Sequence, residues 1–517
     1  MSDFMNSMKD TLNGDNHNVS ITENGAVGYR TTGKNLLDLS FAVASLRKTP
    51  EAEIAKRFSK AFFDDKLTAM KWLFYARDVR GGLGERRLFR AVLLDMAKTM
   101  PQYIKPIIPL VPEYGRWDDL WCLLYTPLKE DVISLVRQQL MEDTENRMVK
   151  KPVSLLAKWM PRCKTSSKRT RSYGQTMRKG LHMTESEYQS TLAILCNYLK
   201  VVEQQMSAQQ WDEIEYPRVP SRANLVYNKA FLRHDEDRRR AFLESVKKGE
   251  SHINAGTLFP HEIVNKYRSV YNVDDTLEAL WSNLPDTVSG CGNTMAVMDD
   301  SGSMEWVNLP GSTARPLEVA NALAIYFAER SSGQFKDQYM SFSDRPQLIS
   351  LRSGKNLYEK LRITHNHHAG ANTNVEAVFD LVLETAKANH MEQDELPANI
   401  LIISDMEFDS CTTAGTVRGT GWSSYSSGRP NANLFKEIAK RYEAAGYKIP
   451  RLVFWNVASR TGTIPVKEND MGVALVSGFS VNIAKMVMSG KLDPYECLLE
   501  AINVERYQPV EDALRFS

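Results

Sequence analysis

The chain has 517 residues, which is enough for two or three domains with buried cores. Its 65 Lys and Arg residues nearly balance its 63 Asp and Glu residues, so any preference for a polyanion must come from local clustering. The six cysteines are scattered and form no Cys-x-x-Cys pair, which excludes a zinc ribbon and a disulfide framework. We therefore expect a cytoplasmic protein, in the host cytoplasm if the source is viral. No apolar run approaches the roughly 20 residues that span a bilayer, and no membrane partner is expected.

Helical spacing of apolar residues dominates the first half of the chain. Residues 1–35 are rich in Asn, Ser, Thr and Gly and predict a disordered tail. Short turns with Pro or Gly then separate apolar-periodic windows, which predicts an α-helical repeat domain of the HEAT type over residues 36–285. The clearest windows are residues 66–78, 86–99, 131–141 and 185–205.

The pattern changes after Gly290, where short β-rich runs alternate with helical windows. The runs are residues 294–299, 338–342, 399–404 and 451–457. The helical windows between them are residues 316–330, 374–388 and 433–445. This alternation predicts a parallel sheet covered on both faces over residues 290–490, and hence an α + α/β fold class. Residues 491–517 are predicted to form a helical segment that packs back on the preceding domains.

Oxygen-bearing side chains follow two of the predicted strands. The first strand ends in Asp299-x-Ser301-x-Ser303, a later strand ends in Asp405, and a loop before a helix carries Thr373. Because ligands of such sheets bind beyond the carboxyl ends of the strands, we expect these side chains to meet. Hydroxyl and carboxylate oxygens suit Mg²⁺ or Mn²⁺, and an under-neutralised ion would seek an acidic group from a partner. The alternative is that Asp-x-Ser-x-Ser only caps a helix.

A basic segment runs from Asn146 to Thr184, with eleven Lys or Arg residues and no Asp or Glu. Such a run attracts phosphates with an affinity that falls steeply with salt, and interleaved Trp159 and Tyr173 offer rings for unpaired bases. The alternative is a solvated helix face, or a patch paired with acids from elsewhere in the fold. The candidate RNA-binding residues are Arg147, Lys150, Lys151, Lys158, Arg162, Lys164, Lys168, Arg169, Arg171, Tyr173, Arg178 and Lys179.

No segment has the pattern of a catalytic site, so the sequence predicts a protein that is not an enzyme. Cys163 and Arg169 have the Cys-x5-Arg spacing of a phosphatase loop but lack its glycines. The glycine-rich run Arg80-Gly-Gly-Leu-Gly-Glu-Arg-Arg87 lacks the ending of a phosphate loop and predicts a helix-to-helix turn. A hidden metal-dependent nuclease or hydrolase stays open as an alternative.

The chain order, strand context and spacing of the three loop motifs resemble the metal-ion-dependent adhesion site of von Willebrand factor A domains, which have a Rossmann-like fold. The resemblance covers about residues 290–490. It implies that Ser301, Ser303 and Thr373 touch the metal directly. It also implies that Asp299 and Asp405 act through water or hydrogen bonds.

A helical array followed by such a domain resembles the Ro autoantigen, or TROVE, family of RNA-binding proteins. Local likenesses are Arg77-Asp78-x-Arg80-Gly-Gly-x-Gly-Glu85-Arg86 and Ser404-Asp405-Met-Glu407. A related uncharacterised family of bacteria, phages, giant viruses and plants is closer still. Its style of motif appears in Tyr114-Gly-Arg-Trp-Asp-Asp-Leu120, Lys158-Trp-Met-Pro161, Phe231-Leu-Arg-His-Asp235, Pro260-His-Glu-Ile263 and Val453-Phe-Trp-Asn456.

The Ro resemblance implies a monomeric ring closed by the A domain, whose basic surfaces hold single-stranded RNA ends or small structured RNAs. The basic segment would then line the RNA path, and its position adds His182 to the candidate residues. The implied function is a non-catalytic RNA-binding scaffold that presents RNA to a nuclease or another protein with an acidic group for the metal. A metal-dependent protein-interaction module without RNA is the main alternative.

Overall fold

The computed structural model describes residues 18–21, 27–288, 293–305, 308–309, 313–342, 346–367, 375–407, 434–460, 462–465, 473–487, 491 and 493–515. The chain forms two compact units. The sheet unit comprises residues 1–48, 259–273 and 286–501, and the helical unit comprises residues 49–258, 274–285 and 502–517. Among the residues described, no helix combines the length and the apolar character needed to cross a bilayer.

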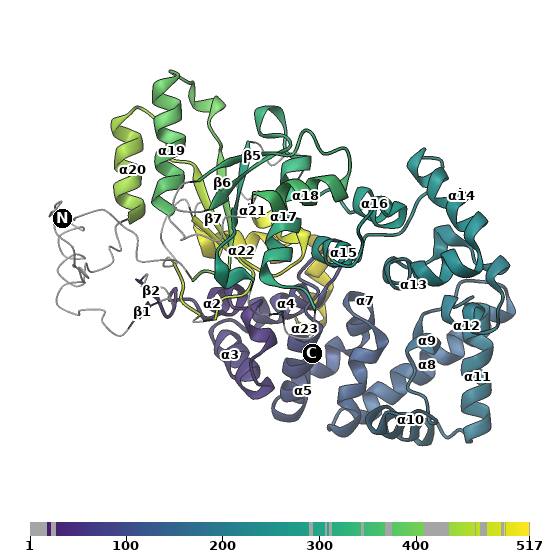
Figure 1. The fold of residues 1–517 in the computed structure, drawn as a ribbon. Helices are drawn as coiled ribbons and strands as arrows, with labels where there is room; N and C mark the ends of the chain where they lie inside the picture. The colour runs from purple at the N-terminus through teal and green to yellow at the C-terminus, as the bar shows by residue number, and fades with distance from the viewer. Residues whose placement is uncertain are drawn as a thin grey trace. The chain divides into compact units, whose positions relative to one another are not determined.

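The helical unit consists of α-helices joined by short connections (Figure 1). Its first helices confirm the predicted windows at 66–78 and 86–99, and α8 extends beyond the window at 131–141. The window at 185–205 is divided between two helices. The elements are α3 (Glu51–Asp64), α4 (Lys66–Arg77), α5 (Arg86–Thr99), α6 (Pro101–Ile104), α7 (Val111–Tyr114), the 3₁₀ helix η3 (Trp117–Tyr125), α8 (Lys129–Met148), α9 (Leu156–Trp159), α10 (Lys168–Gly180), α11 (Glu185–Tyr198), α12 (Val202–Ser207), α13 (Ser221–His234), α14 (Glu236–Lys247), α16 (Asp275–Ser282) and α23 (Gln508–Arg515).

The glycine-rich run forms the predicted turn between helices α4 and α5. Leu83 N donates to the Tyr75 carbonyl oxygen at 3.0 Å, which folds the turn back on the end of α4. A Cβ atom on Gly82 would lie 1.9 Å from that same oxygen, and Gly84 has a φ of 73°. Glycine is therefore required here by close approach and by the left-handed backbone, which accounts for the motif without a bound phosphate.

Helix α23 packs on α4 within the helical unit, so the last residues of the chain complete this unit. Lys71 of α4 forms an ion pair with Glu511 of α23, and both side chains are largely buried. Just before α23, the Arg506 guanidinium binds the buried Asp78 carboxylate. The Tyr114 hydroxyl also donates to the Arg506 carbonyl oxygen at 2.5 Å.

The sheet unit combines a central sheet with surrounding helices. Its elements are β1 (Val19–Ile21), β2 (Val27–Tyr29), α2 (Asn35–Phe41), α15 (Pro260–Tyr267), β3 (Thr294–Asp299), α17 (Pro316–Arg330), β4 (Gln338–Phe342), β5 (Leu348–Ser350), α18 (Leu357–Asn366), α19 (Val375–Ala388), β6 (Asn399–Ser404), α20 (Leu434–Ala444), β7 (Arg451–Asn456), β8 (Val473–Ser477), α21 (Ala484–Val487) and α22 (Pro494–Ile502). The four predicted strands and the three predicted helices are all present.

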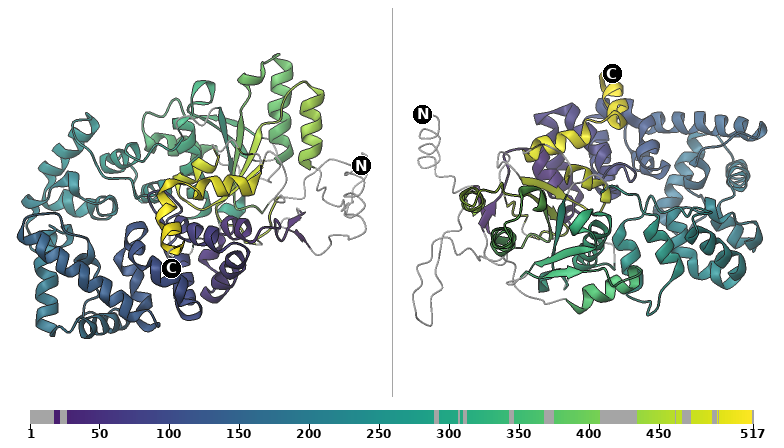
Figure 2. Two further views of the ribbon diagram at one scale, coloured as in Figure 1. Left: turned by 180° about the vertical axis from the view of Figure 1, so that it is seen from behind. Right: turned by 90° about the horizontal axis from the view of Figure 1, so that it is seen from above.

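The strand order is β5-β4-β3-β6-β7-β8, and all neighbours pair in parallel except β5, which runs antiparallel to β4 at the edge. Every residue of β3 and β6 is buried, so both faces of the sheet are covered. Figures 1 and 2 show the strands enclosed between helices of the same unit. The sheet is thus mixed rather than wholly parallel, and the chain has an α + α/β fold.

Part of the N-terminal region is hydrogen-bonded into the sheet unit. Residues 1–17 of the predicted tail lie outside the described residues. Beyond them, β1 pairs with β2 as an antiparallel hairpin, and Tyr29 exchanges backbone hydrogen bonds of 2.8 and 2.9 Å with Ile464. The backbone N–H of Ala44 donates to the Ser477 hydroxyl at the end of β8. The N-terminal residues thereby contribute to the sheet unit.

Candidate functional site

The carboxyl ends of β3 and β6 hold Asp299 in a buried position. Met298 pairs with Ile403 across the parallel strands, so the residues that follow them lie side by side. The Ser404 hydroxyl donates to Asp299 Oδ2 at 2.5 Å, and the Ser301 backbone N–H donates to Asp299 Oδ1 at 2.9 Å. Asp299 is 1% exposed, so its carboxyl is positioned by these bonds rather than by water.

Ser301 and Ser303 extend this cluster toward Asp405, which follows β6. The two serine hydroxyls lie 2.9 Å apart, and the Ser303 hydroxyl also hydrogen-bonds the Asp405 carboxyl. The backbone N–H of Glu407 donates to Asp405 Oδ1 at 3.2 Å. The structure therefore brings together four of the five predicted metal-site residues, and the fifth, Thr373, lies outside the described residues.

The two carboxyl groups are electrostatically costly in their ionised forms. Burial, and secondly the charge of Asp405, raises the pKa of Asp299 to about 7. Burial also raises the pKa of Asp405, against the opposing effect of hydrogen bonds from Glu407 and Ser303 and of the Arg460 guanidinium. A divalent cation beside these groups would favour both ionised forms, and the hydroxyl and carboxyl oxygens are donors that Mg²⁺ accepts.

No histidine or cysteine of the described residues contributes to this cluster. Among the residues described, no group of three or more His, Cys, Asp and Glu side chains is placed to hold a metal ion. An ion at the carboxyl edge would depend on serine hydroxyls in addition to the two carboxyl groups. This donor set suits a hard cation.

Two further residues at this edge were not among the predicted site residues. Glu407 is 1% exposed and accepts a 2.8 Å hydrogen bond from the Arg460 backbone N–H. The Arg460 guanidinium lies 3.7 Å from Asp405 Oδ2. Between them in the chain, Met406 has a φ of 63°, in the left-handed region that favours glycine. This tight turn directs Asp405 and Glu407 into the same buried edge.

The basic segment lies in the helical unit, over the end of α8, the whole of α9 and α10, and the connections around them. Most of its candidate residues are exposed, namely Lys150, Lys151, Lys164, Lys168, Arg169, Arg171, Lys179 and His182. The remaining candidates are half-buried, namely Arg147, Lys158, Arg162, Tyr173 and Arg178.

Few acidic side chains neutralise the basic segment. Lys158 pairs with Glu203 at 3.2 Å, and Lys164 pairs with Glu185 at 3.1 Å. The other nine Lys and Arg residues form no ion pair with a carboxylate of the described residues. Some are oriented by backbone carbonyls instead, as where Arg178 Nη1 donates to Met183 O at 3.0 Å. The segment thus keeps most of its positive charge available to an external anion.

Aromatic rings accompany these cations. Tyr173 stacks on Tyr125 with 5.7 Å between ring centroids, and Tyr125 is 56% exposed. Arg169 Nε donates to the Tyr173 hydroxyl at 2.8 Å, with the guanidinium 5.5 Å from the ring centre. Tyr125 lies outside the basic segment in the chain, and no local sequence pattern links it to Tyr173, which is 48 positions away. Charge and ring surface therefore occur together on the helical unit.

Comparisons with known proteins match both units. The family described as Domain of unknown function (DUF2828) matches residues 22–152 and 125–290. The family described as Domain of unknown function (DUF7788) matches residues 293–511. The chain is also 30% identical over 533 residues to a protein of Acanthamoeba polyphaga mimivirus described as Uncharacterized protein L728, covering 95% of this chain and 89% of that relative.

Proposed function

The chain belongs to the family described as Domain of unknown function (DUF2828), and we propose that it is a non-catalytic RNA-binding scaffold. Its basic segment holds single-stranded or small structured RNA. The single observation that carries the proposal is that nine of the eleven cations of this segment have no carboxylate partner among the described residues. A structural salt-bridge network would leave few such cations, whereas a polyanion-binding surface needs them.

The arrangement of charge and rings favours RNA over a small anion. The cations of the basic segment lie at the end of α8, on α9 and α10 and in the connections around them, so they are spread over several elements rather than gathered around one point. The Tyr125 and Tyr173 rings are next to them, and an unpaired base stacks on such rings with little regard to its identity. A chain of phosphates with unpaired bases satisfies both features.

Nucleophilic catalysis is not part of the proposal. Cys163, which has phosphatase-like spacing to Arg169, is 2% exposed, and burial raises the pKa of its thiol. A catalytic thiol needs the opposite, an accessible sulfur with a lowered pKa. The four described cysteines at 122, 163, 196 and 497 are free and buried, and we place the protein in the cytoplasm, where thiols stay reduced.

The proposal assigns the carboxyl edge of the sheet to Mg²⁺ or Mn²⁺, as in the metal site of von Willebrand factor A domains. Ser301 and Ser303 would hold the ion, with Asp299 and Asp405 behind them and Thr373 as the further hydroxyl. The buried, mutually unfavourable carboxyl groups support this assignment because a cation would relieve their repulsion. When bound, the ion would supply a positive site for an acidic group of a protein partner, such as a nuclease.

A matched pair of triple variants tests the RNA proposal. The Lys168→Ala/Arg169→Ala/Arg171→Ala variant removes three exposed cations that form no ion pair with a described carboxylate. The control Arg218→Ala/Arg240→Ala/Lys248→Ala removes three exposed cations that pair with acids. Binding of a single-stranded RNA oligomer is measured against salt concentration. We expect the slope of log affinity against log salt to fall by about 2 in the first variant only. Equal slopes in both variants would remove the basic segment from the function.

The two alternatives give different results in the same assays. A metal-dependent protein-interaction module would bind a protein partner in an EDTA-sensitive manner, with no salt-dependent RNA affinity in the wild type. A nuclease or hydrolase would degrade the RNA oligomer when Mg²⁺ or Mn²⁺ is added, whereas the scaffold leaves it intact. Either result would overturn the proposed function.

A further inference from the structure

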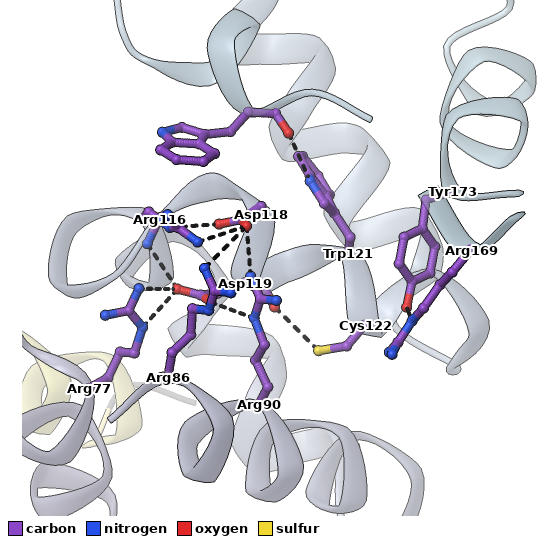
Figure 3. A network of polar contacts seen from close by, with 11 residues as sticks. Arg77, Arg86, Arg90, Arg116, Asp118, Asp119, Trp121, Cys122, Arg169 and Tyr173 are labelled. Atoms are coloured by element: carbon purple, nitrogen blue, oxygen red, sulfur yellow. Dashed lines mark hydrogen bonds and ion pairs between the residues drawn. The ribbon is translucent and has the colours of Figure 1, made fainter. Parts of the chain in front are cut away.

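Four arginines gather around two aspartates in the helical unit, outside the basic segment (Figure 3). Arg86 and Arg90 lie four residues apart on one face of α5. Arg116 directly precedes η3, whose first turn carries Asp118 and Asp119. Arg77 comes from the end of α4. We call these six residues the arginine cluster. Four positive charges against two negative ones leave a surplus of two positive charges.

Asp119 has a structural role in this cluster. It is fully buried and accepts from Arg77 Nε at 2.8 Å, from Arg90 Nε at 2.6 Å and from the Arg116 backbone N–H at 3.0 Å. Hydrogen bonds from guanidinium groups to a buried carboxylate are strong, so Asp119 fixes the side chains of Arg77 and Arg90. The positions of these two guanidinium groups, and of the backbone at Arg116, are therefore set before any ligand arrives.

Asp118 differs because it lies at the surface of the same cluster. Its Oδ2 atom lies 3.0 Å from Arg116 Nη2, 2.9 Å from Arg90 Nη2 and 3.9 Å from Arg86 Nη1. Three guanidinium groups thus meet at one carboxylate oxygen. The side chains remain partly exposed, at 47% for Arg86, 29% for Arg90 and 30% for Arg116. One carboxylate cannot satisfy the donors of three guanidinium groups.

An aromatic ring lies next to this convergence of charge. The Arg116 guanidinium is 4.0 Å from the ring centre of Trp159, a residue of the basic segment. The Trp121 indole N–H donates to the Trp159 carbonyl oxygen at 3.0 Å, which fixes the backbone that carries the ring. The arginine cluster is therefore continuous with the basic segment through Trp159.

We propose that Arg86, Arg90 and Arg116 bind one phosphate of the RNA backbone, and that Asp118 takes the place of that phosphate when RNA is absent. This inference rests on the proposed function and adds a defined subsite to it. A phosphate oxygen accepts from the same N–H groups that now converge on Asp118 Oδ2. Asp118 then acts as an internal competitor, while Asp119 keeps the Arg90 guanidinium and the Arg116 backbone in position.

Two substitutions with opposite expected signs test the subsite. Arg86→Gln removes an exposed donor whose nearest carboxylate contact is 3.9 Å long, so it should leave the fold intact. Binding of a single-stranded RNA oligomer should weaken roughly fivefold, with a salt slope smaller by about 0.7. Asp118→Asn removes the competing charge, and binding should tighten by a similar factor. The control is Arg57→Gln on α3, where Arg57 is 45% exposed and paired with Glu53.

The outcomes separate this subsite from the proposed function as a whole. Weaker binding by Arg86→Gln, tighter binding by Asp118→Asn and no change in Arg57→Gln would support the subsite. Wild-type RNA binding with no change in either cluster variant would overturn the subsite and leave the proposed function standing. No RNA binding by the wild type would overturn both. Weaker binding by both variants with unchanged melting temperatures would contradict the competitor role of Asp118.

Discussion

The carboxyl edge of the sheet and the basic segment hold their charges in opposite ways. At the sheet edge, Asp299 and Asp405 are buried within hydrogen bonds, and their negative charges repel each other. In the basic segment, nine positive charges form no ion pair with a carboxylate in the part of the chain that the structure describes, and most are exposed to solvent. We therefore expect the carboxyl edge of the sheet, the first region, to respond to a single bound ion and to pH. The basic segment, the second region, should respond to ionic strength and to a polyanion such as RNA.

The largest expected effect is a loss of metal affinity at the carboxyl edge of the sheet, without a change in RNA affinity. Ser301→Ala removes a hydroxyl that lies 2.9 Å from the Ser303 hydroxyl, and Mg²⁺ or Mn²⁺ affinity should fall by more than about a hundredfold. Isothermal calorimetry measures this change, with Ser350→Ala at the exposed end of β5 as the control. RNA affinity should stay the same in both variants. Unchanged metal affinity in Ser301→Ala would show that the metal site is misassigned.

Raising the ionic strength should weaken the binding of RNA to the basic segment. If about five of these nine cations contact phosphates, RNA affinity falls roughly a hundredfold between about 50 and 200 mM salt. Fluorescence anisotropy with a labelled single-stranded RNA oligomer gives the slope. A salt-independent affinity would mean that phosphate contacts do not carry the binding.

In the absence of metal, the free energy of unfolding should depend on pH through the carboxyl edge of the sheet. Since the pKa of Asp299 is raised to about 7, the folded state favours the protonated carboxyl. The protonated carboxyl therefore contributes to the stability of the folded state. This stabilisation is fully present below the unfolded-state pKa of about 4 and is lost as the pH rises through about 7. Asp299→Asn mimics the protonated form. It should therefore be more stable than the wild type by about 1–3 kcal/mol at pH 8, with a smaller difference at pH 5.

Urea unfolding at both pH values, with EDTA present, measures these differences in the free energy of unfolding. The triple variant of Lys168, Arg169 and Arg171 is the comparison from the exposed region, and its stability should not change with pH in this way. A variant Asp299→Asn that is less stable than the wild type at pH 8 would contradict the predicted repulsion.

The smallest expected effect separates ring stacking from charge within the second region. Tyr125→Leu removes an exposed ring without changing charge, so RNA affinity should fall about fivefold with the salt slope unchanged. Phe63→Leu is the matched control because Phe63 is 69% exposed on α3 of the same unit. A change of slope in Tyr125→Leu would show that the ring acts by positioning Arg169 rather than by stacking.

The elements of the fold that the sequence predicts are those with a clear local pattern of apolar residues. Strands β3 and β6 are fully buried, and such strands appear as continuous apolar runs, so their bounds were predicted to the residue. The edge strand β5 is only three residues long and exposes two of them. Its apolar pattern is therefore too short to predict a strand from the sequence. Helix α8 extends to Met148 through a polar stretch whose acidic residues gave no apolar signal beyond residue 141.

The candidate sites were predictable to a similar extent. The rule that parallel strands end at one edge was enough to bring Asp299, Ser301, Ser303 and Asp405 together. The contacts of Arg460 with Asp405 and Glu407 depend on residues about fifty positions apart, and no local pattern encodes them. Similarly, the charge run of the basic segment is local, but its pairing with Glu203 and Glu185 depends on the packing of separate helices.

Photocrosslinking identifies the residues of the chain that contact bound RNA. A single-stranded RNA oligomer with 4-thiouridine at every second position is irradiated with the full chain, and the crosslinked peptides are identified by mass spectrometry. We predict crosslinks within residues 147–182 and at Tyr125, which disappear at high salt. Crosslinks confined to other parts of the chain, or none at any salt concentration, would contradict the assignment of the basic segment to RNA.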